Sequence, residues 1–330
     1  MEFRRPIHDV HASRVAANET EALIVNLELE LVAEGLQFPE GPVAMADGSV
    51  LLVEIQRQTL SCVDASGQRT TVAELPGGPN GAAIGPDGAT YICNNGGSIQ
   101  FIEKKGKTFP GPTPASHRHG SIQRVDLQTG TVTTLYEECD GLPLWAPNDL
   151  VFDRQGGLWF TDHGRGTPTG RDYGALYYAS ADGGRIVCAV PHLIGPNGVG
   201  LSPDDRTVYV ADSFLARLWA FDIVEPGVTR RIAAGIPGRS VANLPGVQFL
   251  DSLAVERDGR VCVGTIGQGG ITVFDPATGG TEFAAVPDPY CTNICFGGAD
   301  GRDAWITAST TGRLYKARWP RPGLRLAYGA

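Results

Sequence analysis

The stretch PNGAAIGPDG, from Pro79 to Gly88, returns in five further versions along the chain. These read PEGPVAMADG, PNDLVFDRQG, PNGVGLSPDD, LDSLAVERDG and TNICFGGADG, and begin at positions 39, 147, 196, 250 and 292. The second residue of every version is polar, and the residue eight positions after it completes a turn pair such as Asp-Gly. Neighbouring versions begin 40 to 68 residues apart, which is typical of a repeat architecture. The 330 residues would otherwise suggest about two domains.

Each version is interpreted as a β-hairpin, because two short apolar runs flank a turn of Gly and Asp. The second run is clear at Val50–Val53, a third strand is indicated at Ile271–Asp275, and a fourth fits Thr281–Val286. No stretch beyond the N-terminus has a convincing helical period. Four antiparallel strands in each of six repeats predict an all-β fold, a six-bladed β-propeller with a central metal site.

The first hairpin begins late, so the N-terminal residues need a separate assignment. Residues 1–21 are expected to form a polar arm, and residues 22–330 a single propeller domain. The run ALIVNLELELVAE, residues 22–34, alternates enough to form a strand that pairs with the last blade. Such pairing would close the ring and remove exposed strand edges. The C-terminal run Gly323–Tyr328 is the competing candidate for this closure.

Three long loops interrupt the regular pattern, at Gly96–Gly120, His163–Tyr173 and Gly235–Val247. The first two fall between the second and third strands of their blades, whereas the third is expected to join two blades. The second strand of a blade ends where the first began, so the first two loops share an end with the repeated polar residues. Long loops in a compact fold are usually functional or disordered, and here they predict a lid over a central pocket.

The composition narrows the class of partner. A net charge of −9 argues against nucleic acid, whose phosphates require a basic face. The sequence has no run of 18 apolar residues, so no membrane span is expected. The N-terminal MEFRRPIHDVHASR lacks the apolar core of a secretory signal. Seven scattered cysteines fit reduced thiols and a cytoplasmic location. The expected partner is a small-molecule substrate, and the oligomeric state stays open.

The repeated polar position supplies the candidate site. Its members are Glu40, Asn80, Asn148, Asn197, Asp251 and Asn293. Equivalent positions in a ring of repeats converge on one axis, so carboxylate and amide oxygens are expected to gather there. Such hard ligands suit one divalent cation, Ca²⁺ foremost, with Mg²⁺ or Mn²⁺ possible. The alternative is that Asn and Asp merely begin strands well, which does not account for Glu40.

A second set of polar residues lies where the second strands end, further from the axis. It contains Glu54, Asn94, Asn95, Asp162, His163, Asp212 and Ser213. These residues either serve the site or simply line a hydrated rim. His163 is the most useful of them chemically, because histidine titrates near neutrality, and Arg165 follows closely.

Four segments carry a family resemblance: LQFPEGPV (Leu36–Val43), APNDLVFD (Ala146–Asp153), GPNGVGLSPD (Gly195–Asp204) and DSLAVERDG (Asp251–Gly259). They resemble the SMP-30/gluconolactonase/luciferin-regenerating-enzyme family, which includes regucalcin-like proteins. The similarity extends to diisopropylfluorophosphatase-type propellers and covers about residues 31 to 319. The resemblance implies a six-bladed propeller with one divalent cation in its channel, often Ca²⁺ and sometimes Zn²⁺.

The resemblance also implies which residues hold the cation. The matching positions are Glu40, Asn148, Asn197 and Asp251. The family pattern leaves Asn80 near the pocket but off the metal. The fifth phrase departs from the usual Asp-Gly by having Asp251-Ser252, which affects the local backbone and leaves the aspartate in place.

The leading hypothesis is a metal-dependent lactonase, an enzyme that opens a sugar-acid lactone or another small cyclic ester by attack of water. Asp251 is the expected general base, a role that the resemblance also implies, and His163 is the second catalytic candidate. Substrate contacts are expected from Asn80, Asn95, Asn293 and Arg165. One alternative is a hydrolase of phosphotriesters or fluorophosphates, with Asp251 as nucleophile. Another is a metal-stabilised propeller that binds a ligand without turnover.

Overall fold

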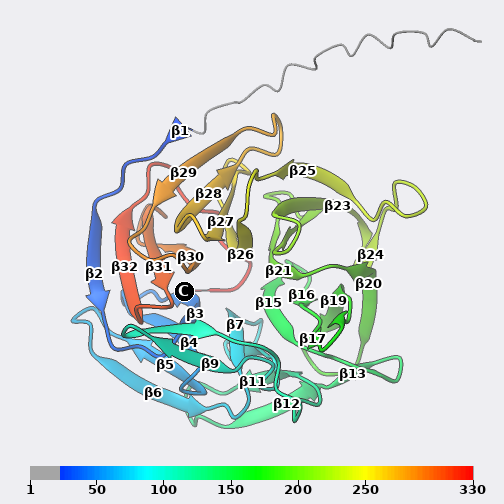
Figure 1. The fold of residues 1–330 in the computed structure, drawn as a ribbon, viewed down its shortest axis with the longest axis horizontal. Helices are drawn as coiled ribbons and strands as arrows, with labels where there is room; N and C mark the ends of the chain where they lie inside the picture. Colours follow the sequence, from blue (N-terminus) through cyan, green and yellow to red (C-terminus); the bar gives the residue numbers. More distant parts are fainter. Residues whose placement is uncertain (1–22, 330) are drawn as a thin grey trace, which may run out of the picture.

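The computed structural model describes residues 23–329, which form six antiparallel four-stranded sheets arranged as blades around a central axis (Figure 1). The sequence-based prediction of a six-bladed, all-β propeller is therefore confirmed. The described residues contain no helix, and hence none that could span a membrane. The predicted arm of residues 1–21 lies outside the described residues.

Each blade contributes its first strand to the axis and its fourth to the outer rim. Blade one contains β3 (Pro39–Ala44), β4 (Val50–Glu54), β5 (Thr59–Val63) and β6 (Arg69–Glu74). Blade two contains β7 (Pro79–Ile84), β8 (Thr90–Asn94), β11 (Ser121–Val125) and β12 (Val132–Tyr136). Blade three contains β15 (Pro147–Phe152), β16 (Gly157–Asp162), β19 (Gly174–Ser180) and β20 (Ile186–Leu193).

The second half of the ring repeats this plan. Blade four contains β21 (Pro196–Leu201), β22 (Thr207–Asp212), β23 (Arg217–Glu225) and β25 (Arg239–Asn243). Blade five contains β26 (Phe249–Val255), β27 (Val261–Ile266), β28 (Gly270–Phe274) and β29 (Thr281–Ala285). Blade six contains β30 (Cys291–Gly297), β31 (Asp303–Ala308), β32 (Arg313–Arg318) and β2 (Leu29–Ala33). Short strands also occur outside this plan: β1 (Leu23–Ile24), β13 (Glu138–Cys139), β14 (Leu142–Pro143) and β24 (Val228–Thr229).

The N-terminal segment closes the ring. Strand β2 pairs antiparallel with β32, with Leu29 opposite Ala317, so the bluest strand of the ring lies beside the reddest (Figure 1). The expected single strand over residues 22–34 is divided in two, because β1 instead runs parallel to β29 of blade five. Closure by pairing leaves β32 without a free edge.

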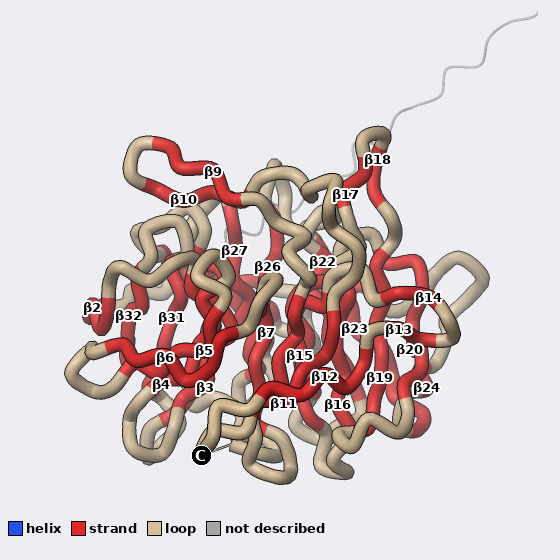
Figure 2. The backbone as a smooth tube through the Cα atoms, turned by 90° about the horizontal axis from the view of Figure 1, so that it is seen from below, coloured by secondary structure: helices blue, strands red, loops and turns tan. Residues whose placement is uncertain are grey.

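The C-terminal segment does not join a blade as a strand. The backbone N–H of Leu324 donates to the carbonyl of Val255 at 2.8 Å, and the Tyr328 ring meets Phe152 edge to face at 5.9 Å. The chain end therefore lies across the axis at the end opposite the long loops (Figure 2). Residues 324–328 help to enclose a small cavity of about 110 Å³ there.

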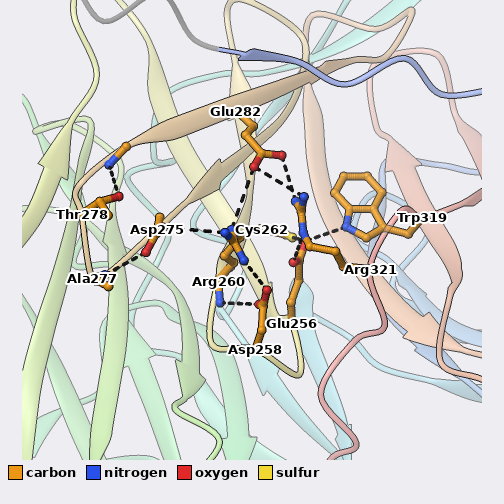
Figure 3. Close-up of polar contacts among 11 residues, drawn as sticks. Glu256, Asp258, Arg260, Cys262, Asp275, Ala277, Thr278, Glu282, Trp319 and Arg321 are labelled. Atoms are coloured by element: carbon orange, nitrogen blue, oxygen red, sulfur yellow. Dashed lines mark hydrogen bonds and ion pairs between the residues drawn. The ribbon is translucent and has the colours of Figure 1, made fainter.

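A polar network holds this C-terminal segment to blade five (Figure 3). The fully buried carboxylate of Glu256 accepts hydrogen bonds from the Trp319 indole N–H at 2.7 Å and from Arg321 Nη2 at 3.1 Å. Arg321 also pairs with Glu282 at 3.0 Å. Because a buried carboxylate is costly without such partners, these contacts fix the path of the chain after its last strand.

The long loops carry structure of their own. Gly96–Gly120 contains a hairpin of β9 (Phe101–Lys104) and β10 (Lys107–Pro110), and His163–Tyr173 contains β17 (Gly166–Thr167) and β18 (Gly170–Arg171). Both hairpins rise from one end of the ring (Figure 2). The prediction of a loop at Gly235–Val247 was wrong, because this stretch contains β25, which pairs with β23. The short β24, which pairs with the end of β23, lies between β23 and β25, so β25 begins later in the chain than a fourth strand joined by a tight turn would.

Candidate active site

Every first strand is irregular at the repeated polar position. In blade one, residues Glu40 to Val43 face only Val53 to Leu51, so one residue of β3 is extra. Register shifts at the corresponding place occur in β7, β15, β21, β26 and β30. An extra residue locally bends a strand and re-aims its side chains. The repeated phrase thus encodes both a polar side chain and the bulge that presents it.

Five of the six repeated polar residues line one cavity of about 410 Å³, namely Glu40, Asn80, Asn148, Asn197 and Asp251. This volume suits a small-molecule site. The cavity lies at the end of the ring that bears the two hairpins, and Pro110–Thr113 of the first long loop form part of its wall. The sixth residue, Asn293, borders the smaller cavity on the other side.

Asn293 holds Glu40 in place. Its amide Nδ2 donates to Glu40 Oε2 at 2.7 Å, and the Gly41 N–H donates to the same oxygen at 2.5 Å. The second carboxylate oxygen, Oε1, is buried and has no hydrogen-bond partner among the described residues. Burial raises the pKa of Glu40 to about 7. An ionised Glu40 would consequently be stabilised by a cation at Oε1.

The remaining floor of the cavity is also rich in oxygen acceptors. Asn148 Oδ1 is buried without a partner among residues 23–329. Asn197 donates through Nδ2 to Ser213 Oγ at 3.2 Å, which fixes its amide, and Ser252 Oγ lies 3.5 Å from its Oδ1. Burial, followed by the charge of Glu40, raises the pKa of Asp251 well above its usual value. This oxygen-only donor set fits a hard divalent cation.

Asp149 is a buried acidic residue near the axis that the sequence analysis missed, and it borders the smaller cavity on the other side. It follows Asn148 at a position that is glycine in three other repeats, and its carboxylate is buried. Oδ1 accepts from the Leu150 N–H at 2.9 Å and Oδ2 from the Val199 N–H at 3.3 Å. Burial and the charge of Glu40 raise the pKa of Asp149 to about 8. Of the three carboxyl groups near the axis, only those of Glu40 and Asp251 therefore line the larger cavity.

The glycines of the repeated phrase make room at the axis. A Cβ on Gly41 would lie 2.7 Å from the Asn80 carbonyl oxygen, and one on Gly198 would lie 2.7 Å from that of Asp251. A Cβ on Gly81 would lie 2.6 Å from the Asn148 carbonyl oxygen and 2.9 Å from Asp149 Oδ1. Neighbouring first strands approach this closely only because these positions lack side chains.

Most of the second set of polar residues serves the backbone. Asp162 accepts from the N–H groups of Trp145, Ala146 and Gly164 at 2.6 to 2.9 Å, and Glu54 accepts from the Gln37 N–H at 2.8 Å. These bonds fix the segments that lead into the first strands of blades one and three. The residues that follow the strand ends behave differently, because Asn95, His163 and Ser213 line the cavity.

His163 is held as a neutral imidazole. Its Nδ1 lies 3.3 Å from the Pro196 carbonyl oxygen, so Nδ1–H is the donor and Nε2 is left as an acceptor. Burial and the charge of Arg171 lower the pKa of His163 to about 3. The ring packs near Phe214, with centroids 5.4 Å apart.

Arg165 lies away from the cavity. Its Nε pairs with Asp172 Oδ2 at 2.6 Å, its guanidinium carbon lies 3.6 Å from the centre of the Trp145 ring, and it is not among the cavity-lining residues. The arginine that does line the cavity is Arg171, at the end of β18. The sequence pattern does not distinguish these two arginines of one loop.

The hairpin β9–β10 crosses from blade two towards blade six. The Thr108 N–H donates to the Thr310 carbonyl at 3.0 Å, and the Phe109 ring meets Tyr290 edge to face at 5.7 Å. The Gly166 N–H of the second hairpin donates to Thr113 Oγ1 at 3.3 Å. The two long loops therefore touch each other beside the cavity, as expected of a lid.

A family model described as the SMP-30/Gluconolactonase/LRE-like region matches residues 38–310, which covers blades one to five and the first two strands of blade six. The chain belongs to this family. Lactonase drp35 of Staphylococcus saprophyticus is 30% identical over 271 residues, covering 79% of this chain and 74% of the relative. The gluconolactonase of Zymomonas mobilis is 25% identical over 319 residues, covering 87% and 80%.

Solved structures agree with this family's fold. The crystal structure of regucalcin from Agrobacterium tumefaciens, described as a calcium-binding protein, superimposes with a TM-score of 0.71 at 19% identity. The superposition covers 92% of this chain and 100% of regucalcin. At this identity the likeness shows the propeller fold alone.

Proposed function

We propose that the protein is a lactonase that opens a small cyclic ester with the help of one divalent cation. One observation carries the proposal: the unpartnered oxygens Glu40 Oε1 and Asn148 Oδ1 are buried at the floor of a cavity sized for a small molecule. A native protein rarely leaves buried polar atoms without partners, so each one requires an explanation. Relatives named lactonase and gluconolactonase support this choice of substrate class.

The cation would be held by the four residues that the family resemblance implied, namely Glu40, Asn148, Asn197 and Asp251. Ca²⁺ is the first choice, with Mg²⁺, Mn²⁺ and Zn²⁺ as alternatives, because the donors are carboxylate and amide oxygens. When bound, such a cation polarises a lactone carbonyl and lowers the pKa of water. Asn293 acts on this set through Glu40, whose carboxylate it orients.

The chain itself supplies proton transfer and substrate orientation. Asp251 borders the cavity and is partly exposed to it, so its carboxylate can take a proton from an attacking water. Neutral His163 can accept a hydrogen bond at Nε2 from a substrate hydroxyl or from the opened alcohol. Asn80 and Asn95 line the same cavity and can orient the ring substituents. Apolar walls that include Phe38, Ile55 and Phe249 would limit the entry of water.

Acid release from a panel of γ- and δ-lactones, followed with a pH indicator, tests the proposal. Phosphotriesters and a fluorophosphate are measured beside them, each with and without a chelator. Lactone opening that is lost with the chelator and restored by added Ca²⁺ is expected. Acid release from the phosphorus esters alone would show that the protein is a different kind of hydrolase. If no substrate releases acid, the propeller that binds a ligand without turnover would be favoured.

A further inference from the structure

The unpartnered polar atoms that border the cavity fall into two groups of opposite character. At the floor, Glu40 Oε1 and Asn148 Oδ1 are acceptors, as a cation requires. At the wall, Asn95 Nδ2 and Arg171 Nε are donors. The Asn95 amide is oriented by its own oxygen, which accepts from the Gly97 N–H at 2.9 Å. Unmet donors call for an oxygen-rich or negatively charged ligand.

Arg171 is the strongest of these donors. Among the described residues no carboxylate lies within ion-pair distance of it, since neighbouring Asp172 pairs with Arg165. Within residues 23–329 it makes one hydrogen bond, from Nη2 to the His163 carbonyl oxygen, although a guanidinium carries five donors. One face of the group is covered by Phe214, whose ring centre lies 4.2 Å from the guanidinium carbon. The guanidinium is thereby fixed in orientation, and most of its N–H donors lack an acceptor among the described residues.

The surroundings of Arg171 explain why no internal anion neutralises it. Asp162 directs its carboxylate at backbone N–H groups, and Asp212 accepts from the Leu215 N–H at 3.3 Å through Oδ1, while its Oδ2 is buried and lacks a partner among the described residues. Both carboxylates influence Arg171 only beyond ion-pair range. A partly buried guanidinium without a counter-ion is costly, and a planar anion that binds two of its donors would offset that cost.

We infer that Arg171 is a specificity residue that binds an anionic substituent of the substrate, so that the preferred lactone carries a free carboxylate besides its cyclic ester. This inference rests on the proposed lactonase function and names its substrate class. The carboxylate engages the guanidinium edge while the lactone carbonyl lies at the acceptor-rich floor. Asn95 Nδ2 then donates to an oxygen of the same substrate.

The test compares two lactones that differ in one substituent. D-Glucaro-1,4-lactone carries a carboxylate where D-glucono-1,4-lactone carries a hydroxymethyl group. For Arg171→Met, kcat/KM on the charged lactone should fall about 10- to 100-fold, mainly through KM, as expected for the loss of a charge-assisted pair. The value for the neutral lactone should change less than about 3-fold. Arg171→Lys should fall between, because it keeps the charge and loses the planar fork.

Arg217→Met is the matched control, because this arginine lies over Trp219 and donates to Asn243 outside the cavity. It should leave the preference between the two lactones unchanged. Equal losses on both lactones in Arg171→Met would overturn the inference, as would a selective loss in Arg165→Met with none in Arg171→Met. Melting temperatures of all variants identify any that are merely unstable.

Calorimetric binding of D-glucarate and D-gluconate separates this inference from the function on which it rests. If the wild type opens neither of these lactones nor any other lactone of the panel, the proposed function fails. Even then, the anionic subsite would be supported if glucarate binds the wild type more tightly than gluconate does and this difference is lost in Arg171→Met. No preference for glucarate in the wild type would refute it.

Discussion

Asp251 and Glu40 both supply carboxylates to the axis, but their surroundings differ. Glu40 is almost fully buried and accepts a hydrogen bond from Asn293. Asp251 is partly exposed to the cavity and accepts no hydrogen bond from Asn293. The repeated phrase located both residues because one offset recurred in all six copies. The sequence analysis missed Asp149 because most copies have a small residue at this position, and only the structure places its carboxylate beside the smaller cavity.

Asp251→Asn should separate a ligand role from a base role. The amide keeps an oxygen of nearly the same shape, so affinity for the cation should fall only modestly from the loss of one charge. Lactone turnover at saturating cation should fall about 10²- to 10⁴-fold, as expected for a positioned general base. Asn148→Asp is the control, since it adds a charge without removing the base and should not raise activity. Recovery of Asp251→Asn to wild-type turnover at saturating cation would restrict Asp251 to a ligand role.

His163 should make the fold sensitive to acid. Its pKa of about 3 in the folded chain lies below the ordinary value of about 6.5, so the unfolded chain takes up a proton first as the pH falls. The wild type should therefore lose stability relative to His163→Gln between pH 7 and pH 5, by at most about 2 kcal/mol. Urea unfolding of both proteins at the two pH values measures this difference. A difference that does not change with pH would show that His163 titrates normally.

At the scale of elements, the hairpins were predictable because Asp-Gly pairs carry their own turn geometry, as at Gly48 with φ +84°. The fourth strand of blade four could not be predicted from the sequence. β25 is short, follows the β24 hairpin and lies in a stretch with three glycines and two prolines, a composition typical of a loop. Its position is set by pairing with β23, which is a tertiary effect.

Two glycines of the first hairpin should respond differently to substitution. Gly48 has positive φ and open space around it, so Gly48→Ala should cost about 1–2 kcal/mol through backbone strain alone. Gly41 also has positive φ, and its added Cβ would collide with the backbone of β7. Gly41→Ala should therefore cost about 1–3 kcal/mol more, and cation affinity should fall with it. Denaturant unfolding and cation titration of both variants check this, and equal costs would contradict the crowding at the axis.

The whole molecule is a ring completed by its own N-terminal strand, a result that the sequence left open between two segments. The C-terminal run was an equally good strand by composition. The structure favours β2 because Trp319 and Arg321 are held by Glu256, which directs the last residues beneath the axis instead of along β32.

Removal of β2 should open the ring. A chain that begins at residue 35 exposes the edge of β32 and loses the packing of Ala33, whereas one that begins at residue 23 keeps both β1 and β2. The shorter chain should unfold at a clearly lower temperature and form aggregates through its free edge. Thermal melts and light scattering of the two chains measure this. Equal melting temperatures would mean that β2 contributes little to closure.

The pairing of β2 with β32 also sets an order of events during synthesis. Leu29–Ala33 leave the ribosome before the six repeated hairpins, but their partner Arg313–Arg318 is made after all six of them. Blades one to five can acquire their hairpins while the chain grows, because those contacts are local. The ring itself can close only after Arg313–Arg318 has been made, so the nascent chain carries an unpaired strand while all the intervening blades are synthesised. This interval is when a holding chaperone would be of most use to the protein.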